Sequence, residues 1–467
     1  LLRERYGERY RWLLLLSVMV GTMASIMSST IVNVAIPDMS HHFTLGQERA
    51  QWVSAGFMVA MKVSMLTTPW LLARYGYRRT YVGTMVLLLA GGVVGGLSNA
   101  WALVLAARVA EGLAAGVVQP IPAIIILRAF EPHEQGRASG FFGMGVVLAP
   151  AIGPTVGGVL VEHFGWRSIF FVVVPFALWA MLLARRYLPV SAPGGAEPGE
   201  HSSPLDWVGL ALAAVGVIGL LNGLVHLHDA APWSAAVHLG IGVTALGLFV
   251  WHAARTPTPL FDLGLFRSRP FAMGSVVAFV YGMGLFGSTY LVPIFMQTAL
   301  HFPPSQAGAA LMPAGLVLAL TIPTAGRLAD RYPANALVAI GLALLALSFV
   351  LMTSVGPASA LWVLMLWAVV GRIGLGFVLP SLTLGSVAGL GTEAVPQAAS
   401  AISFLRQLGG ATGIGVVGIY LEWRLRVRGA GSVAAFADTF WLVAALAALA
   451  TAAALRMRMP RSRGGTP

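Results

Sequence analysis

The chain has no cysteine, a single lysine and few charged residues of either sign among its 467 residues. The absence of cysteine excludes disulfide bonds, iron–sulfur ligation and thiol catalysis. Charged residues make up 10% of the chain and hydrophobic residues 57%, and the mean hydropathy is +0.81. This composition is too apolar for a water-soluble globule, so we expect a polytopic membrane protein.

Sequence motifs of soluble enzymes are also missing. The chain has no Walker loop, no glycine-rich dinucleotide turn after a strand, no quartet of metal ligands and no catalytic triad. These absences argue against an enzyme, a resident metal or cofactor, and coupling to nucleotide hydrolysis within this chain. An ion gradient is then the expected source of energy for any transport.

Fourteen apolar runs are each about long enough to cross the hydrocarbon core of a bilayer. They are residues 12–36, 51–70, 80–97, 101–127, 137–161, 166–187, 205–225, 234–253, 271–295, 305–324, 336–355, 359–381, 397–421 and 440–457. The expected fold class is therefore an all-α membrane protein with fourteen transmembrane helices.

The net charge of +12 comes mostly from arginines in alternate loops, which argues against a nucleic-acid partner. Excess positive charge marks the cytoplasmic side of a membrane protein, so both termini are expected there. The segment 422–428, which holds three arginines, falls on the outer side and is interpreted as an interfacial collar. The predicted location is a bacterial-type cytoplasmic (inner) membrane, with the lipid bilayer as the obligatory partner.

Short patterns of the first half recur in the second half, separated by about 260 residues. Arg74 pairs with Arg331 in this comparison, and Arg108 with Arg372. Six helices need fewer residues than this separation, which predicts an insertion between two six-helix bundles. The predicted domains are residues 1–190, a cytoplasmic linker 191–204, an inserted helical pair 205–254, and residues 255–467.

The stretch from Gly140 to Gly158 carries small residues and prolines at four-residue steps. Small residues at this spacing share one helix face and allow close approach of another helix, and each proline bends the helix. We interpret the stretch as a bent, tightly packed hinge helix between the two halves, although close packing alone also explains the small residues. The hinge residues are Gly145, Ala149, Pro150, Gly153, Pro154, Gly157 and Gly158.

Together, these features resemble the fourteen-helix drug:proton antiporter branch of the major facilitator superfamily. Residues 29–37 (STIVNVAIP), Arg108 with Gly112, and the hinge stretch carry the resemblance, supported by Arg406 in the segment RQLGG. It implies two six-helix bundles plus two extra helices, working by alternating access.

The chain departs from this family pattern at two positions. Members of the branch usually carry an aspartate where this chain has Ser28, and a glutamine where it has Glu111. A carboxylate is thus absent from the first run and present in the fourth. The sequence alone does not separate a relocated proton site from a lost one.

Charges inside apolar runs are costly and are functional candidates by default. At 1.5 Å per residue, Lys62 lies about 16 Å deep, Glu111 about 15 Å and Arg108 about 10 Å. We therefore predict a proton-coupling site in which Glu111 takes and releases the proton while Arg108 and Lys62 tune its proton affinity. A purely structural ion pair is the equal alternative.

Residues expected to line a substrate cavity combine polar, aromatic and cationic side chains. They are Ser28, Phe57, Met61, Tyr281, Tyr290, Gln297, Arg372 and Arg406. The excess of inward cations favours neutral or anionic amphiphiles over lipophilic cations. Plain helix packing is the alternative for the aromatic and methionine positions.

A cytoplasmic gate is expected at Arg74, Arg78, Asp330 and Arg331. The family pattern in this loop has an aspartate where the first half has Ala73, and the second half keeps it as Asp330. Asp330 is therefore expected to hold the cytoplasmic latch through a neighbouring helix end.

The predicted function is proton-coupled export of hydrophobic or amphipathic compounds, including drugs, by alternating access. One alternative is a lipid or fatty-acid exporter of the same fold, and another is a sensor or scaffold that has lost transport. The sequence leaves open whether a periplasmic adaptor docks on the outer loops.

Overall fold

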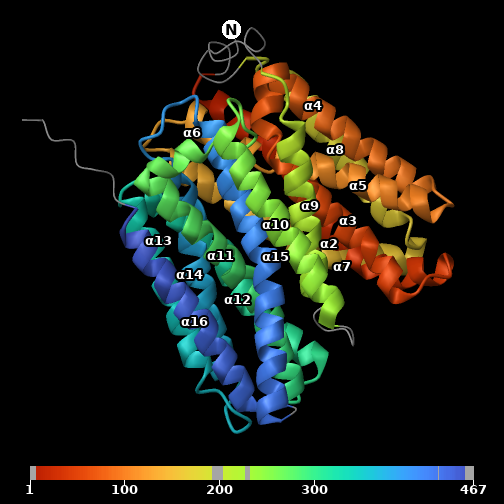
Figure 1. Ribbon diagram of the computed structural model, residues 1–467, viewed down its shortest axis with the longest axis vertical. Coiled ribbons are helices and arrows are strands. Elements are labelled where there is room, and N and C mark those ends of the chain that lie inside the picture. Colours follow the sequence, from red (N-terminus) through yellow and green to blue (C-terminus); the bar gives the residue numbers. More distant parts are fainter. Residues whose placement is uncertain (1–6, 192–202, 227–231, 430, 458–467) are drawn as a thin grey trace, which may run out of the picture. The chain divides into compact units, whose positions relative to one another are not determined.

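The computed structural model describes residues 7–191, 203–226, 232–429 and 431–457 (Figure 1). Throughout these ranges the regular structure is helical and contains no strand. The α-helices are α2 (Arg9–His42), α3 (Gln47–Met65), α4 (Thr68–Leu97), α5 (Trp101–Val118), α6 (Ile121–Ala129), α7 (Gln135–Phe164), α8 (Ser168–Tyr187), α9 (Trp207–His226), α10 (Pro232–Arg255), α11 (Arg269–Ile294), α12 (Pro304–Ala329), α13 (Ala334–Met352), α14 (Leu361–Val387), α15 (Val395–Arg428) and α16 (Val433–Leu455). A short 3₁₀ helix, η1 (Leu263–Arg267), precedes α11, and a π-helical turn, η2 (Phe295–Ala299), follows it.

The prediction of an all-helical, polytopic membrane protein is confirmed. Within the described residues, 12 helices are long and apolar enough to cross a membrane, against the fourteen expected. The two remaining expected spans, 51–70 and 137–161, coincide with α3 and α7, which are not among the 12.

Two expected boundaries differ because of local backbone chemistry. The run at 101–127 divides into α5 and α6 around Pro120, since proline lacks the N–H that would continue the ladder. The expected loop after the second run is a kink inside α4 at Gly76, whose φ of 76° is readily reached only by glycine.

The described residues form two compact units. Unit 1 comprises Leu1–Pro132, Phe141–Ile218 and Gly242–Asp262, and unit 2 comprises His133–Gly140, Gly219–Ile241 and Leu263–Pro467. Both α9 and α10 contribute to the two units. The domain boundaries predicted from the sequence stay a prediction, and residues 192–202 of the predicted linker lie outside the described residues.

In unit 1, α5 packs against both α3 and α4, and α8 packs against α2 and α4. One core cluster joins α2 to α3, α5 and α8 through Ile31, Val32, Val53, Val104 and Phe170, all at most 2% exposed. This packing fixes the helices that carry the buried charges of the first half.

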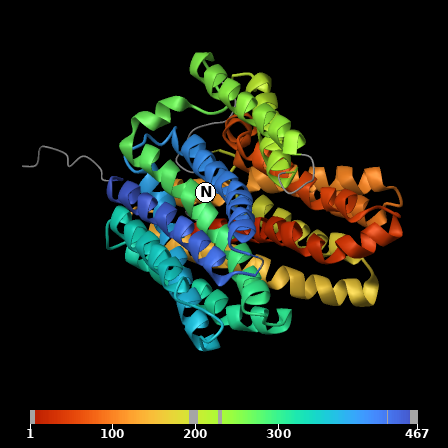
Figure 2. The same cartoon turned by 60° about the horizontal axis from the view of Figure 1, so that its bottom comes forward.

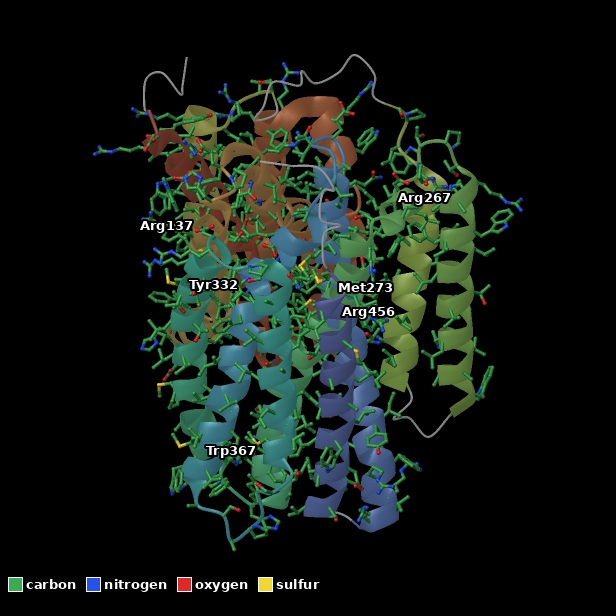
Figure 3. The ribbon with its side chains drawn as sticks, turned by 90° about the vertical axis from the view of Figure 1, so that its left-hand side faces the viewer. Arg137, Arg267, Met273, Tyr332, Trp367 and Arg456 are labelled. Carbon is green, nitrogen blue, oxygen red and sulfur yellow. The ribbon has the colours of Figure 1, made fainter. Side chains whose placement is uncertain are left out.

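In unit 2, α11 packs along α15, and the two helices lie side by side in both ribbon views (Figures 1 and 2). The remaining helices pack as α12 on α14, α14 on α13, and α13 on α16. Figure 3 places Arg137 and Arg267 toward one end of this unit and Trp367 toward the other.

Candidate functional site

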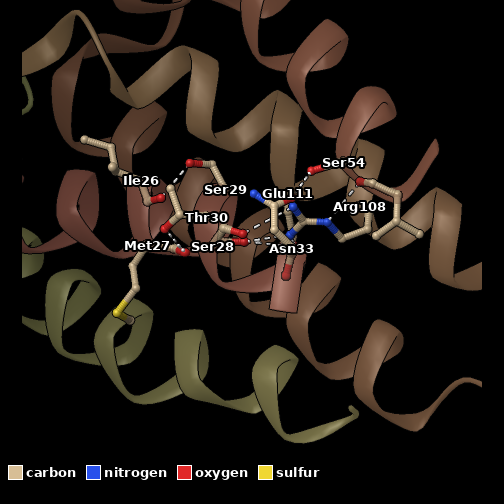
Figure 4. Close-up of polar contacts among 10 residues, drawn as sticks. Ile26, Met27, Ser28, Ser29, Thr30, Asn33, Ser54, Arg108 and Glu111 are labelled. Atoms are coloured by element: carbon tan, nitrogen blue, oxygen red, sulfur yellow. Dashed lines mark hydrogen bonds and ion pairs between the residues drawn. The ribbon is translucent and has the colours of Figure 1, made fainter. Parts of the chain in front are cut away.

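A buried cluster in unit 1 joins Arg108 and Glu111 of α5 to Ser28 of α2 (Figure 4). Arg108 Nη1 donates to Glu111 Oε2 at 2.5 Å and to Ser28 Oγ at 2.8 Å, and Ser28 Oγ donates to Glu111 Oε2 at 3.1 Å. All three residues are at most 1% exposed. Ser28, where members of the branch usually carry an aspartate, therefore contacts Glu111, where they usually carry a glutamine.

Arg108 also has partners other than the carboxylate. Its Nε donates to the carbonyl oxygen of Val53 at 3.3 Å, and its Nη2 donates to that of Ser28 at 3.2 Å. The guanidinium carbon lies 4.3 Å from the ring centroid of Phe57, an attractive cation–π geometry. The arginine thus ties α5 to α2 and α3 by contacts that do not require Glu111 to be charged.

Space for the Glu111 side chain comes from two glycines of α4. A Cβ added at Gly91 would lie 2.6 Å from Glu111 Cγ, and one added at Gly92 would lie 3.7 Å from Glu111 Oε1. That Oε1 atom is buried without a hydrogen-bond partner among the described residues. The sequence shows Gly91 and Gly92 as a glycine pair within an apolar run. It does not show that Glu111 is the side chain that packs against them.

Lys62 makes no hydrogen bond or ion pair with this cluster among the described residues, and its predicted action on Glu111 stays a prediction. Its ammonium lies 3.5 Å from the carbonyl oxygen of Met58, one turn back on α3. The reason is the orientation of α5: Gly112 and Gly116 face the α3 backbone at Phe57 and Met61. Glu111 points instead toward α4 and α2.

A second polar contact beside the cluster was not predicted. Ser54 Oγ of α3 donates to Asn33 Oδ1 of α2 at 2.7 Å (Figure 4). Polar side chains facing each other across two apolar runs are the signal that could have identified it. The contact adds a second link between the helices that hold Arg108.

In unit 2, two arginines surround one tyrosine. The Tyr281 hydroxyl interacts electrostatically with both Arg372 and Arg406. Arg372 Nη2 donates to Thr289 Oγ1 at 3.3 Å. Among the described residues, neither arginine has an acidic partner. This part of unit 2 therefore carries uncompensated positive charge.

The crossing of α11 and α15 brings Arg406 beside Tyr281. Gly282 contacts the Arg406 carbonyl oxygen, and Gly409 contacts that of Phe279. A side chain at either glycine would separate the two helices, because an added Cβ would overlap the facing backbone.

The eight residues predicted to line the substrate cavity are divided between the two units. Ser28 and Phe57 belong to the unit 1 cluster, and Met61 is buried against α5. Tyr281, Arg372 and Arg406 lie together in unit 2, Tyr290 is half-buried, and Gln297 is exposed on η2. Their common role in a substrate cavity stays a prediction.

The small-residue strip of α7 packs against α2. A methyl group at Gly145 would lie 3.1 Å from Met23 Sδ, and one at Gly153 would lie 2.6 Å from Thr30 Oγ1. At Gly157 the nearest atom is Cγ1 of Ile31, at 2.5 Å. The sequence placed this strip between the halves, but these glycines face a helix of their own unit.

The other predicted hinge residues lie on the same helix. Ala149 is buried, and Pro150 and Gly158 are half-buried. Pro154 belongs to α7, but its side chain lies outside the described residues. The bend expected at the two prolines stays a prediction.

Asp330, at the end of α12, contacts the N-terminal turn of α7, and both segments belong to unit 2. Its Oδ1 accepts from the Gly136 N–H at 2.6 Å, and its Oδ2 accepts from that of Arg137 at 3.0 Å. Carboxylates are favourable at helix N-termini. Burial raises the pKa of Asp330, against the lowering effect of the two N–H donors. Close approach of Gly140 to Gly326 accompanies this contact.

The other gate arginines are placed differently. Arg78 Nε donates to the carbonyl oxygen of Leu188 at 2.6 Å, which joins α4 to the end of α8. Arg74 and Arg331 are exposed near the ends of their helices. In the described part of the chain, no group of three or more His, Cys, Asp or Glu is placed to hold a metal ion.

A family model described as Major Facilitator Superfamily matches residues 18–414. The Multidrug resistance protein B homolog of Mycobacterium tuberculosis (strain ATCC 25618 / H37Rv) is 30% identical, over 90% of this chain and 79% of that protein. The uncharacterized MFS-type transporter YhcA of Bacillus subtilis (strain 168) is 29% identical over 70% of this chain, which spans 61% of that relative's length.

Among solved structures, the crystal structure of the human organic anion transporter MFSD10 (TETRAN) is similar, with a TM-score of 0.68 at 18% identity. The similarity covers 95% of this chain and 99% of that chain. At this identity the similarity shows the fold alone.

Proposed function

This chain belongs to the major facilitator superfamily, whose members are transporters rather than enzymes, and we propose that it exports amphipathic compounds in exchange for protons. The name of the multidrug resistance relative supports drugs as one substrate class. We further propose fourteen spans in a bacterial cytoplasmic membrane, with α3 and α7 completing the 12 and both termini cytoplasmic.

The contact between Ser28 and Glu111 carries this proposal. In the branch that the chain resembles, the acid stands at the position of Ser28. Here Glu111 Oε2 lies 3.1 Å from Ser28 Oγ, so its carboxylate occupies neighbouring space from a different helix. The proton site is then relocated rather than lost.

Protonation of Glu111 has a physical consequence for the helices around it. A neutral carboxyl no longer attracts Arg108, while the bonds from Arg108 to Val53 and Ser28 persist. The arginine can therefore remain with α2 and α3 when its ion pair weakens. Taking up a proton would weaken the ion pair within α5 and the hydrogen bond from Ser28 to Glu111, while Arg108 keeps its hydrogen bonds to α2 and α3.

The test is substrate export by reconstituted vesicles under an imposed pH gradient. Glu111→Gln is expected to reduce export to the level of empty vesicles, because an amide cannot exchange a proton. Glu393→Gln is the matched control, since it removes an exposed acid in the loop after α14 and should leave export unchanged. Full-rate export by Glu111→Gln would overturn the proposal.

We also propose that Asp330 stabilises one access state through α7. Its carboxylate accepts two main-chain hydrogen bonds at the first turn of that helix. A change of access that moved α12 away from α7 would break both bonds and leave the N–H groups without these acceptors.

Export of anionic amphiphiles, such as fatty acids, is a second candidate, favoured by the charge of unit 2. Arg372 and Arg406 lie near Tyr281, and neither has an acidic partner among the described residues. Both arginines are half-buried, and a substrate carboxylate would supply an anionic partner for them. Arg406→Gln should then weaken export of an anionic amphiphile more than that of a neutral one of equal size. Equal loss for both substrates would contradict this assignment.

A further inference from the structure

Unit 1 contains a crevice of about 390 Å³ between α3, α4, α5 and α9. Its floor includes Val63 and Val117, which are buried, and its rim includes Leu87 and Leu113, which are 37% and 38% exposed. Ligand pockets in proteins commonly have volumes of about 300–1,000 Å³. The exposed leucines leave one side of the crevice open, where an apolar ligand can enter.

The serine and threonine hydroxyl groups along this crevice are already used, whereas the Tyr75 hydroxyl makes no hydrogen bond with a described residue. Ser64, Thr67, Thr80 and Thr84 each donate to a main-chain carbonyl, at distances of 2.7 to 3.3 Å. None of these hydroxyls has its hydrogen free for a ligand in this arrangement. The wall therefore suits a hydrocarbon chain better than a polar substrate.

One end of the crevice carries a charge. Arg79 is exposed there and makes no hydrogen bond or ion pair with any described residue. It lies in the first turns of α4 after the kink at Gly76, and Leu87 is about 12 Å further along the helix at 1.5 Å per residue. A cation at the boundary of the span with an apolar slot below it is complementary to an anionic lipid.

The inserted helix α9 supplies one wall, through Leu210. Two contacts hold the start of α9 in place: Trp70 Nε1 donates to the Ser203 carbonyl oxygen at 2.8 Å, and Asp206 caps the helix. Asp206 also accepts from His252 of α10 and from the Leu260 N–H. Burial alone would raise the pKa of Asp206, but these hydrogen bonds hold it below its ordinary value.

We propose that the crevice binds one anionic phospholipid of the surrounding bilayer, with an acyl chain between α4, α5 and α9 and the headgroup at Arg79. The lipid fills space that the inserted helix creates against the first half. It is distinct from the transported substrate, because the crevice contains none of the residues of the Glu111 cluster or of the two-arginine site.

Gly83 provides a substitution that fills the crevice. A Cβ added there meets no atom within 4 Å, and Gly83 lines the crevice, so the side chain of Gly83→Leu starts in open space. Gly247→Leu is the matched control, because Gly247 of α10 is also exposed, also has nothing within 4 Å of an added Cβ, and does not line the crevice.

The experiment is native mass spectrometry of the purified full chain after exchange into equal amounts of phosphatidylglycerol and phosphatidylethanolamine. The wild type should retain one phosphatidylglycerol, Gly83→Leu should lose it, and Gly247→Leu should match the wild type. Arg79→Gln should reduce the preference for phosphatidylglycerol about fivefold, the effect of one arginine on an anionic lipid.

Retention of lipid by Gly83→Leu at the wild-type level, or no headgroup preference in the wild type, would overturn the proposal. So would displacement of the lipid by an exported amphiphile, since the crevice would then belong to the substrate. If Gly83→Leu does not fold, the headgroup preference of Arg79→Gln decides. Occupancy is first measured on resting protein without substrate or gradient, so that result does not depend on the proposed export, and the amphiphile is added only afterwards to test displacement.

Discussion

The two halves of the chain present the same helix pattern with opposite electrostatic outcomes. In α5, Arg108 is followed by Glu111 and then Gly112, whereas in α14, Arg372 is followed by Leu375 at the equivalent position and then Gly376. The first half thus holds a buried ion pair that is neutral as a whole. The second half keeps a half-buried arginine without an acidic partner among the described residues.

This difference indicates a division of labour. A buried ion pair contributes little to stability compared with well-packed apolar residues, so its presence in the first half suggests a functional reason. An acid that can be neutralised suits proton exchange, and an uncompensated cation suits recognition of an anionic group. We therefore assign coupling to the first half and substrate charge to the second as a working hypothesis.

Replacing Arg108 and Arg372 one at a time should give the largest difference between the two halves, in the free energy of unfolding. Arg108→Gln should lower the free energy of unfolding by about 3–5 kcal/mol, because it leaves Glu111 buried without its cation. Arg372→Gln should cost less than about 1 kcal/mol, since it removes one hydrogen bond to Thr289. Unfolding in detergent, followed by tryptophan fluorescence, measures both.

The double variant Arg108→Gln with Glu111→Gln is the control for this stability measurement. It removes both charges and should recover part of the stability lost by Arg108→Gln alone. Equal costs for the two single arginine variants would mean that the halves do not differ as described.

Adding an acid to the second half should make it resemble the first. Leu375→Glu places a carboxyl one turn after Arg372, and neutralising that cation should reduce export of an anionic amphiphile about tenfold, corresponding to about 1.4 kcal/mol. Leu375→Gln controls for the polar side chain without the charge. If the two variants transport alike, the charge of Arg372 plays no part in substrate choice.

The halves also differ at a pair of equivalent positions. The first half has Ala73 in α4, and the second half has Asp330 at the end of α12. Asp330→Ala should shift the balance of access states by about 1 kcal/mol, because it removes the acceptor of two N–H groups at the start of α7. Asp330→Asn keeps one acceptor and should fall between. A single cysteine introduced into this cysteine-free chain reports the shift by its labelling rate.

An unchanged labelling rate in Asp330→Ala would show that the contact with α7 does not hold either access state. Ala73→Asp is the converse variant, and it supplies the first half with the acid that its loop lacks. An effect smaller than that of Asp330→Ala agrees with the account, because the structure shows the helix N-terminus contact for Asp330.

Much of the fold was predictable because long apolar runs have few alternatives to membrane helices. The partnership of Arg108 with Glu111 was also predictable, since residues three apart share a helix face. The direction of the Lys62 side chain was not predictable, because depth in the membrane says nothing about direction around the helix axis. Gly112 and Gly116 decide that direction by facing α3, and only tertiary packing shows this.

The small-residue strip gives a similar lesson. The four-residue spacing of Gly145, Gly153 and Gly157 correctly predicted a tightly packed helix face. It did not identify α2 as the partner, because a strip of small residues fits any helix that approaches closely. The crevice beside Gly83 could not be predicted from the sequence, because it depends on where α9 lies against α4.

Moving the carboxylate back to α2 tests the central claim most directly. The measurement is proton uptake on adding substrate to reconstituted vesicles, for the wild type, Glu111→Gln, and Glu111→Gln with Ser28→Asp. Ser28 Oγ lies 2.8 Å from Arg108 Nη1, so an aspartate there would face the same arginine. We predict uptake in the wild type, none in Glu111→Gln, and partial recovery in the double variant. Wild-type uptake by Glu111→Gln, or no recovery in a double variant that still binds substrate, would contradict the relocated proton site.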